Sequence, residues 1–146
     1  MQLSLHSDYA LRVLMALAAS QRQLSVDDIA RRYAISRNHL AKVAQRLQAE
    51  GLIETFRGRG GGMRLARPAE DIVVGDVVRR FENFGSFVGC FAAETGCAVG
   101  GLCALKPALN GALEAFLAHL DGYRLSDLVP NRTAFLERLE TVAAAA

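Results

Sequence analysis

Long apolar runs and catalytic motifs are both missing from this sequence. No stretch stays apolar for the roughly 20 residues that a membrane-spanning helix needs. The chain also lacks a Ser–His–Asp ordering, the cysteine triplet of radical enzymes and a glycine-rich loop ending in Gly-Lys-Ser or Gly-Lys-Thr. These absences lead us to expect a cytoplasmic binding protein, and neither a membrane protein nor an enzyme.

Cysteine is scarce, and its distribution is uneven. The three cysteines, Cys90, Cys97 and Cys103, lie in one stretch rich in Gly and Ala. Three thiols cannot all pair as disulfides, and the cytoplasm disfavours such bonds. A lone free cysteine is usually a buried apolar residue, but three so close together favour a metal site. The gaps contain no Cys-x2-Cys pair, which favours an iron–sulfur cluster and leaves zinc as the alternative.

Positive charge is concentrated in the first part of the chain. Of the 146 residues, 51% are hydrophobic, which is enough for one domain with a substantial core. Residues 1–80 contain 13 Lys or Arg against 8 Asp or Glu, whereas residues 81–146 contain 4 against 7. The basic first part predicts an anionic partner there.

Apolar residues at helical spacing predict three short helices in the first fifty residues. Ser7, Ser25 and Ser36 are the expected N-caps, Asp28 completes a capping box, and Gly51 is the expected C-terminal stop. The predicted core positions are Ala10, Val13, Leu14, Leu17, Val26, Ile29, Ala30, Tyr33, Leu40, Val43, Ala44 and Leu47.

A β-hairpin and further helices are predicted after residue 51. The runs LIETF and MRLA flank the turn RGRGGG, and Pro68 ends the second run. A short helix near Gly75 and a long helix with Pro107 in its first turn follow, and then a final helix. The long helix carries a seam for a partner helix, namely Leu102, Leu105, Leu109, Leu113, Phe116 and Leu120. The predicted fold is mainly α with a small β-hairpin wing: a winged helix-turn-helix plus a long dimerisation helix.

A basic surface is predicted on the third helix and on the hairpin tip. Residues 31–67 contain 9 Lys or Arg against 2 Asp or Glu. Asn, Arg and Lys read base edges, and an arginine on a thin glycine loop fits the minor groove. This pattern favours a DNA-binding face over a solvated face or a protein-binding face. The candidate DNA-binding residues are Ser36, Arg37, Asn38, His39, Ala41, Lys42, Gln45, Arg57, Arg59, Gly60 and Arg64.

The sequence resembles the Rrf2 family of bacterial winged-helix regulators over nearly its whole length. The resemblance rests on the segments LSLHSDYALRVLMALA, ISRNHLAKVAQRLQAEGLIETFRGRGGGMRLAR, IVVGDVVRRFE and LKPALNGALEAFL, and on the three cysteines. Members that regulate iron–sulfur assembly have a His soon after the third cysteine, whereas here ALKPA follows Cys103 and the next His is His119. The resemblance is therefore stronger to the family's nitric-oxide-sensing repressors.

The resemblance implies a homodimeric repressor that binds a palindromic operator. It implies a cluster, of the 4Fe–4S type with 2Fe–2S as the alternative, on Cys90, Cys97 and Cys103, with Asp8 of the partner subunit as fourth ligand. His6, Glu94, His39 and His119 are other candidates for that position, and Asp8 is equally explained as a favourable charge at a helix N-terminus. The alternatives are an iron- or redox-sensing regulator, a zinc-bound or apo regulator, and an electron carrier that does not bind DNA.

The expected organisation has three parts within one compact chain. Residues 1–80 form the DNA-binding region, residues 81–104 the cluster-binding loop, and residues 105–146 the dimerisation helix and the C-terminal helix.

Overall fold

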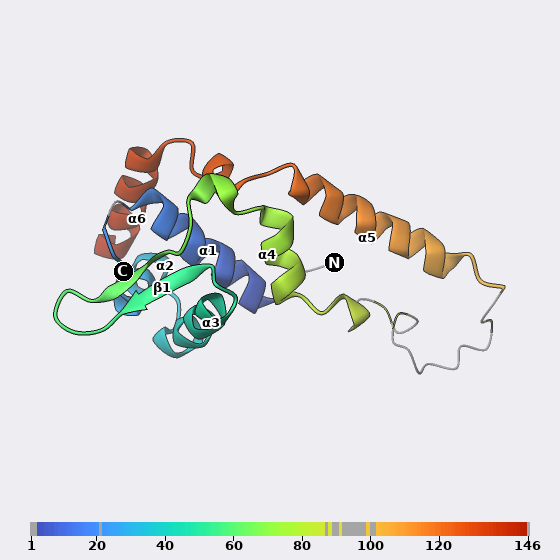
Figure 1. The fold of residues 1–146 in the computed structure, drawn as a ribbon, viewed down its shortest axis with the longest axis horizontal. Coiled ribbons are helices and arrows are strands. Elements are labelled where there is room, and N and C mark those ends of the chain that lie inside the picture. The colour runs from blue at the N-terminus through green and yellow to red at the C-terminus, as the bar shows by residue number, and fades with distance from the viewer. Residues whose placement is uncertain are drawn as a thin grey trace.

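Helices dominate the architecture, and a hairpin follows the third of them (Figure 1). The computed structural model describes residues 3–20, 22–86, 88, 91, 99 and 102–145. The elements are α1 (Leu5–Ala19), α2 (Val26–Tyr33), α3 (Arg37–Ala49), β1 (Ile53–Phe56), β2 (Gly62–Leu65), η1 (Ala69–Asp71), α4 (Val74–Phe81), η2 (Phe84–Ser86), α5 (Leu105–Asp121), η4 (Leu125–Leu128) and α6 (Arg132–Ala145). The predicted fold class is confirmed.

Helix α1 is the centre of the hydrophobic core. It packs against α3, α4 and α6, and also against β2. The predicted positions Ala10, Val13, Leu14 and Leu17 are at most 5% exposed, because their spacing places them on one face of the helix. The core positions predicted in α2 and α3 also lie in this cluster or pack against it.

The start of α1 differs from the prediction. The helix begins one turn earlier than Ser7, because Ser4 takes the N-cap position and its Oγ accepts a hydrogen bond from the Ser7 N–H at 3.2 Å. The backbone N–H of Ser4 donates to Oε1 of Glu82 at 2.7 Å, which ties the earlier start to the end of α4. Ser7 is instead a buried residue inside the helix, so its assignment as N-cap is wrong.

The hairpin lies where the sequence predicted it. β1 and β2 are antiparallel, with Ile53 opposite Leu65 and Phe56 opposite Gly62. At the tip, Gly61 must lack a side chain, since a Cβ there would lie 2.4 Å from the Phe56 carbonyl oxygen. The glycine run of the turn is therefore a steric requirement of a tight reversal.

Helix α5 packs on α4 and extends away from the other helices (Figure 1). It begins at Leu105, so Leu102 lies outside the helix, and the prediction that Leu102 belongs to the helical seam is wrong. Within α5 only Leu113 is fully buried, and Leu105 is 59% exposed. The other seam residues of α5, Leu109, Phe116 and Leu120, are half-buried, so the seam is only partly covered in one chain.

Helix α6 returns to the first part of the chain. It packs against α1 and α2, and its Leu139 joins the core. The functional division of the chain into three parts stays a prediction.

Candidate functional site

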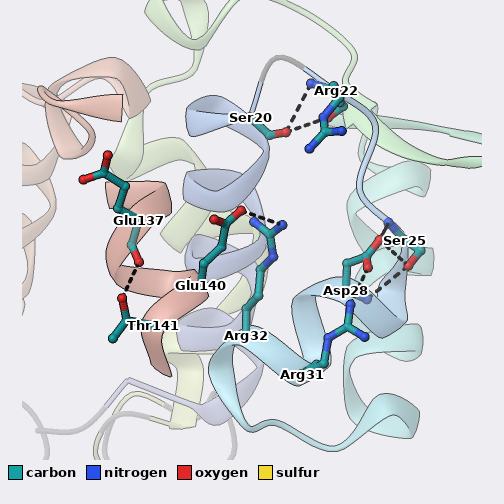
Figure 2. Close-up of polar contacts among 9 residues, drawn as sticks. All are labelled: Ser20, Arg22, Ser25, Asp28, Arg31, Arg32, Glu137, Glu140 and Thr141. Carbon is teal, nitrogen blue, oxygen red and sulfur yellow. Dashed lines mark hydrogen bonds and ion pairs between the residues drawn. The ribbon is translucent and has the colours of Figure 1, made fainter. Parts of the chain in front are cut away.

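Helix α3 is placed by a tight turn and by its apolar face. Ser25 and Asp28 form the predicted capping box at the start of α2 (Figure 2). Between α2 and α3, Ala34 is left-handed (φ 53°, ψ 41°), and the Ile35 N–H donates to the Ala30 carbonyl at 3.0 Å. Because Leu40 and its apolar neighbours face the core, the opposite face of α3 is turned outward.

The outward face of α3 carries the side chains predicted to contact DNA. Ser36 holds the N-cap position without a side-chain hydrogen bond, which leaves the first N–H groups of the helix uncapped. Such an N-terminus attracts phosphate. Ala41 is half-buried, and the other predicted residues of this face are exposed: Ser36, Arg37, Asn38, His39, Lys42 and Gln45.

Two side chains of this face also have partners within the chain. Arg37 Nε lies 2.6 Å from Asp27 Oδ1, and both side chains are about two-thirds exposed. An exposed pair of this kind contributes roughly 0–1 kcal/mol, so exchanging it for a phosphate costs little. His39 stacks on Tyr9 of α1 with 6.5 Å between the ring centroids.

The hairpin tip presents two arginines, and a third is held further back. Arg57 and Arg59 are exposed and have no hydrogen bond or ion pair with the residues that the structure describes. Gly60, which follows Arg59 in the turn, is left-handed (φ 78°). Arg64 instead pairs with Glu54 at 2.8 Å and lies over the Phe56 ring at 4.7 Å. Arg57 and Arg59 are thus available to bind a ligand, whereas Arg64 already has a partner.

A groove of about 360 Å³ connects the helix and the hairpin. Arg37, Ala41 and Gln45 line it from α3. Gln48 and Thr55 also line it, and the Thr55 hydroxyl donates to Gln48 Oε1 at 3.0 Å. Gln48 is not among the DNA-binding residues predicted from the sequence, although it continues the spacing of Ala41 and Gln45 on one helical face.

The described part of the cysteine site is Cys103. This thiol is half-buried and precedes the uncapped N-terminus of α5, where no side chain satisfies the first N–H groups. Cys90, Cys97 and Glu94 lie outside the described residues. Among the residues described, no three His, Cys, Asp or Glu side chains gather as a metal site.

Asp8 is in the first turn of α1, and its carboxylate is reachable. Its Oδ2 accepts a hydrogen bond from Arg12 Nε at 2.8 Å, and its side chain is 39% exposed. The Arg12 guanidinium also lies 5.6 Å from the centre of the Tyr33 ring. Burial raises the pKa of Tyr33 to about 12.

The three histidines offered as other ligands are engaged in ring contacts. His6 stacks on Phe81 at 5.9 Å between centroids, and His119 makes an edge contact with Tyr123 at 5.3 Å. His39 belongs to α3, as described above. None of these contacts involves Cys103.

Residues 3–131 match the family model Rrf2, described as an iron-dependent transcriptional regulator. The chain belongs to the Rrf2 family. It is 48% identical over 143 residues to the HTH-type transcriptional regulator NsrR of Bacillus subtilis, covering 96% of this chain and 98% of that protein.

Solved structures of other regulators share the fold of this Rrf2 protein. IscR of T. potens superposes with a TM-score of 0.70 at 25% identity, over 89% of this chain and 87% of that chain. The oxidized form of CymR from Staphylococcus aureus gives 0.68 at 27% identity, over 90% and 98%.

A carboxylate between α1 and α4 adds a contact that sequence analysis of this Rrf2 protein did not predict. Burial alone would raise the pKa of Glu82, but hydrogen bonds from Ser7 and from Ser4 outweigh it and hold that pKa below its ordinary value. Glu82 follows α4 directly, so an ionised carboxylate joins the end of α4 to the start of the helix that carries Asp8. No periodicity or motif marks such a long-range contact.

None of the helices in the described part of this Rrf2 protein is both long and apolar enough to cross a membrane.

Proposed function

We propose that this protein is a cytoplasmic, homodimeric transcriptional repressor that binds a palindromic operator, holds an iron–sulfur cluster and responds to nitric oxide. The observation that carries the proposal is the groove between an uncapped, outward-facing α3 and an arginine-tipped hairpin, in a chain that has three cysteines and 48% identity to a regulator named NsrR. The protein acts by binding and has no catalytic role.

The DNA-binding face divides into two kinds of contact. Arg37, Asn38, Lys42 and Gln45 lie where a recognition helix reads base edges in the major groove. The tip arginines Arg57 and Arg59 enter the adjacent minor groove, where the negative potential is concentrated. Ser36 and the uncapped N–H groups of α3 hold a phosphate.

The cluster, of the 4Fe–4S type, is held by Cys90, Cys97 and Cys103, with the partner's Asp8 as the fourth ligand. The described donors suit this role, because Cys103 lies at an uncapped helix start and the Asp8 carboxylate reaches solvent. A carboxylate is a harder ligand than a thiolate and is exchanged more readily. When bound, the cluster supplies an iron that a small diatomic molecule can reach.

Asp8 then acts through its own helix. Binding of the Asp8 carboxylate in the other subunit competes with its ion pair to Arg12. When that binding is lost, the Asp8–Arg12 ion pair forms again. Since α1 packs against α3, a change at the start of α1 alters how the two recognition helices of the dimer are spaced. Half-sites lie about one helical turn apart, so a small change in spacing weakens operator binding.

A second candidate, an iron- or redox-sensing regulator, is favoured by the family model, which is described as an iron-dependent transcriptional regulator. It differs in its signal and not in its architecture. In that case peroxide or dithionite changes operator affinity, and nitric oxide does not.

The ligand assignment is tested by anaerobic purification of the full-length protein and its variants. We expect a brown protein that contains iron and sulfide, and a colourless Cys103→Ser variant. Asp8→Ala keeps the colour with an altered visible circular dichroism spectrum, whereas Arg12→Gln, which removes the same ion pair but spares the carboxylate, leaves the spectrum unchanged. A colourless wild type contradicts the cluster, and identical spectra for Asp8→Ala and wild type contradict the fourth ligand.

A further inference from the structure

A second hollow, of about 680 Å³, lies beside the base of the hairpin. Its walls come from the C-terminal end of α1, from the α1–α2 connection, from both hairpin strands, from residues 66–70 and from the start of α6. Its volume is within the range of metabolite-binding pockets, about 300–1,000 Å³. The proposed repressor function does not use this hollow.

The hollow lies on the other face of the hairpin from α3. Side chains alternate between the two faces of a strand, and Thr55 points toward Gln48 of α3. Its neighbour Glu54 therefore belongs to the opposite face, together with its pairing partner Arg64. Both of these residues line the hollow, so the hollow is separate from the groove assigned to DNA.

Positive charge exceeds negative charge in the walls. Two of the arginines have carboxylate partners: Arg64 lies 2.8 Å from Glu54, and Arg132 lies 3.9 Å from Glu70. The other two, Arg22 and Arg67, are exposed and have no side-chain hydrogen bond or ion pair with any residue that the structure describes. Two unpaired guanidinium groups thus share one concave surface.

An adjoining hollow contains an arginine that, unlike Arg22, has a carboxylate partner. This space of about 450 Å³ shares Ser20, Arg22 and Arg132 with the first. There, Arg32 pairs with Glu140 at 3.5 Å, whereas Figure 2 shows the Arg22 guanidinium without such a contact. The Ser20 hydroxyl hydrogen-bonds with the backbone N–H and carbonyl of Arg22 (Figure 2). These bonds fix the Arg22 backbone and leave its guanidinium group available for a ligand.

We propose that the hollow beside the hairpin base binds a small metabolite with two anionic groups, carboxylate or phosphate, held by Arg22 and Arg67. Guanidinium groups bind both kinds of anion through paired hydrogen bonds. Two anionic groups match two unpaired cations, and the remaining lining is already neutralised by Glu54 and Glu70. The ligand bridges the α1–α2 connection and the segment after β2, and it thereby braces the wing that carries Arg57 and Arg59.

Calorimetric titration of the anaerobic full-length protein with glutarate and with fructose bisphosphate tests this site. The ionic strength is kept constant with chloride, and the visible absorbance is followed to show that the cluster stays intact. We expect saturable binding of at least one probe, and the probe that binds distinguishes a carboxylate from a phosphate ligand. The double variant Arg22→Gln/Arg67→Gln should weaken binding about tenfold or more, since both charged hydrogen-bonding groups are lost.

Two further variants make the result specific. Arg138→Gln removes one exposed arginine of α6 outside the hollow and should leave the affinity for the probe unchanged. The double variant Arg22→Lys/Arg67→Lys keeps both positive charges but loses the planar guanidinium groups, which donate paired hydrogen bonds. It should bind the probe with an affinity between those of the wild type and the glutamine double variant. Its melting temperature should match that of the wild type. Binding of the probe should also shift operator affinity in the wild type and not in the glutamine double variant.

Three results would overturn the proposal. The first is the absence of saturable binding of either probe to the wild type. The second is equal weakening by Arg138→Gln and by the glutamine double variant. The third is a loss of operator affinity in the glutamine double variant without any probe, accompanied by a shallower salt dependence, which would assign Arg22 and Arg67 to the DNA backbone. None of these results bears on the cluster or on nitric oxide.

Discussion

Asp28 shows how one side chain fixes the start of the helix-turn-helix. Its Oδ2 accepts from the Ser25 N–H at 3.0 Å, while its own N–H donates to Ser25 Oγ at 3.0 Å. The hydrogen bond from the Ser25 hydroxyl is the main cause that holds the pKa of Asp28 below its ordinary value, and the nearby Arg31 and Arg32 act in the same direction. The folded state therefore favours the ionised carboxylate.

We predict that Asp28→Ala lowers the free energy of unfolding by about 1 kcal/mol at neutral pH, which is typical of a lost helix cap. The stabilisation is present above the unfolded pKa of 3.8 and disappears as the pH falls through the lower folded value, because a protonated carboxyl no longer accepts these bonds. Urea denaturation of wild type and variant between pH 7 and pH 3 measures the difference.

Asp71→Ala is the matched control for Asp28→Ala. Asp71 is exposed in η1 and outside any capping box, so its removal should change stability by less than about 0.5 kcal/mol. Equal effects of the two variants at neutral pH, or a cost of Asp28→Ala that persists unchanged in acid, would contradict the role given to the capping box.

Local residue chemistry was predictable from the sequence wherever the partner is near in the chain. The Ser25–Asp28 box and the left-handed Gly51 (φ 67°) follow from motifs within a few residues. Ser4 was not predictable as the N-cap of α1, because its advantage includes a bond to Glu82, 78 residues away. The short-range pattern alone favours Ser7 equally well.

At the scale of elements, the wing and the recognition helix contribute differently to binding. We predict that Arg57→Gln and Arg59→Gln each weaken operator binding. Each should also make the negative slope of log affinity against log salt shallower by about 1, since each removes one phosphate-neutralising charge. Fluorescence anisotropy over a series of salt concentrations measures both quantities. Arg138→Gln on α6 is the control, and a slope unchanged from wild type in both wing variants would contradict the wing contact.

Asn38→Ala tests the recognition helix separately. The side chain is exposed near the start of α3, where an amide pairs with adenine. We predict a loss of about 1–3 kcal/mol in discrimination at one operator position, with the salt dependence unchanged. Binding to a set of single-base operator variants measures this, and a uniform loss over all sequences would instead indicate a backbone contact.

The junction of α4 with α5 depends on a glycine. Arg79 holds Asp121 through two hydrogen bonds of 2.5 and 2.7 Å, and this ion pair raises the pKa of Arg79 and lowers that of Asp121. A Cβ at Gly75 would lie 2.0 Å from Asp121 Oδ1. A side chain at position 75 would therefore require the Asp121 carboxylate to shift from its present position against Arg79.

We predict that Gly75→Ala lowers stability relative to Gly111→Ala. A Cβ at Gly111 meets nothing within 4 Å, so alanine there should stabilise α5 by about 0.5–1 kcal/mol. At position 75 the same gain in helix propensity is offset by displacement of Asp121 from Arg79. In an Asp121→Ala background, Gly75→Ala should become as favourable as Gly111→Ala is in the wild type. Thermal unfolding of the wild type, the three single variants and the Asp121→Ala/Gly75→Ala double variant measures these effects.

The elements themselves were largely predictable, because periodicity and turn residues are local signals. Pro107 in the first turn also predicted the start of the long helix correctly, but the extent of its apolar seam was not predictable. Leu102 continues the spacing of Leu105 and Leu109, yet α5 begins only at Leu105, and Leu102 is 95% exposed. Apolar spacing identifies a face, but it does not show where the backbone leaves the helix.

At the scale of the whole molecule, α4 connects the two proposed sites. It packs on α1, which carries Asp8 and contacts α3, and on α5, whose start follows Cys103. The sequence predicts a site at each end of this path, at the cysteines because of their count and on α3 and the hairpin because of their charge. The path between them could not be predicted, because it consists of contacts such as Arg79–Asp121 and Ser4–Glu82 between distant residues.

The central claim is that nitric oxide controls operator binding through the iron–sulfur cluster. The most direct measurement is operator affinity of the anaerobic, brown full-length protein, followed by anisotropy as nitric oxide is titrated in and the visible spectrum is recorded in the same cuvette. We predict that affinity falls by about tenfold or more as the cluster absorbance is lost, and that apo protein binds the operator as weakly as the fully reacted sample. Operator affinity that stays constant while the cluster absorbance disappears would contradict the claim.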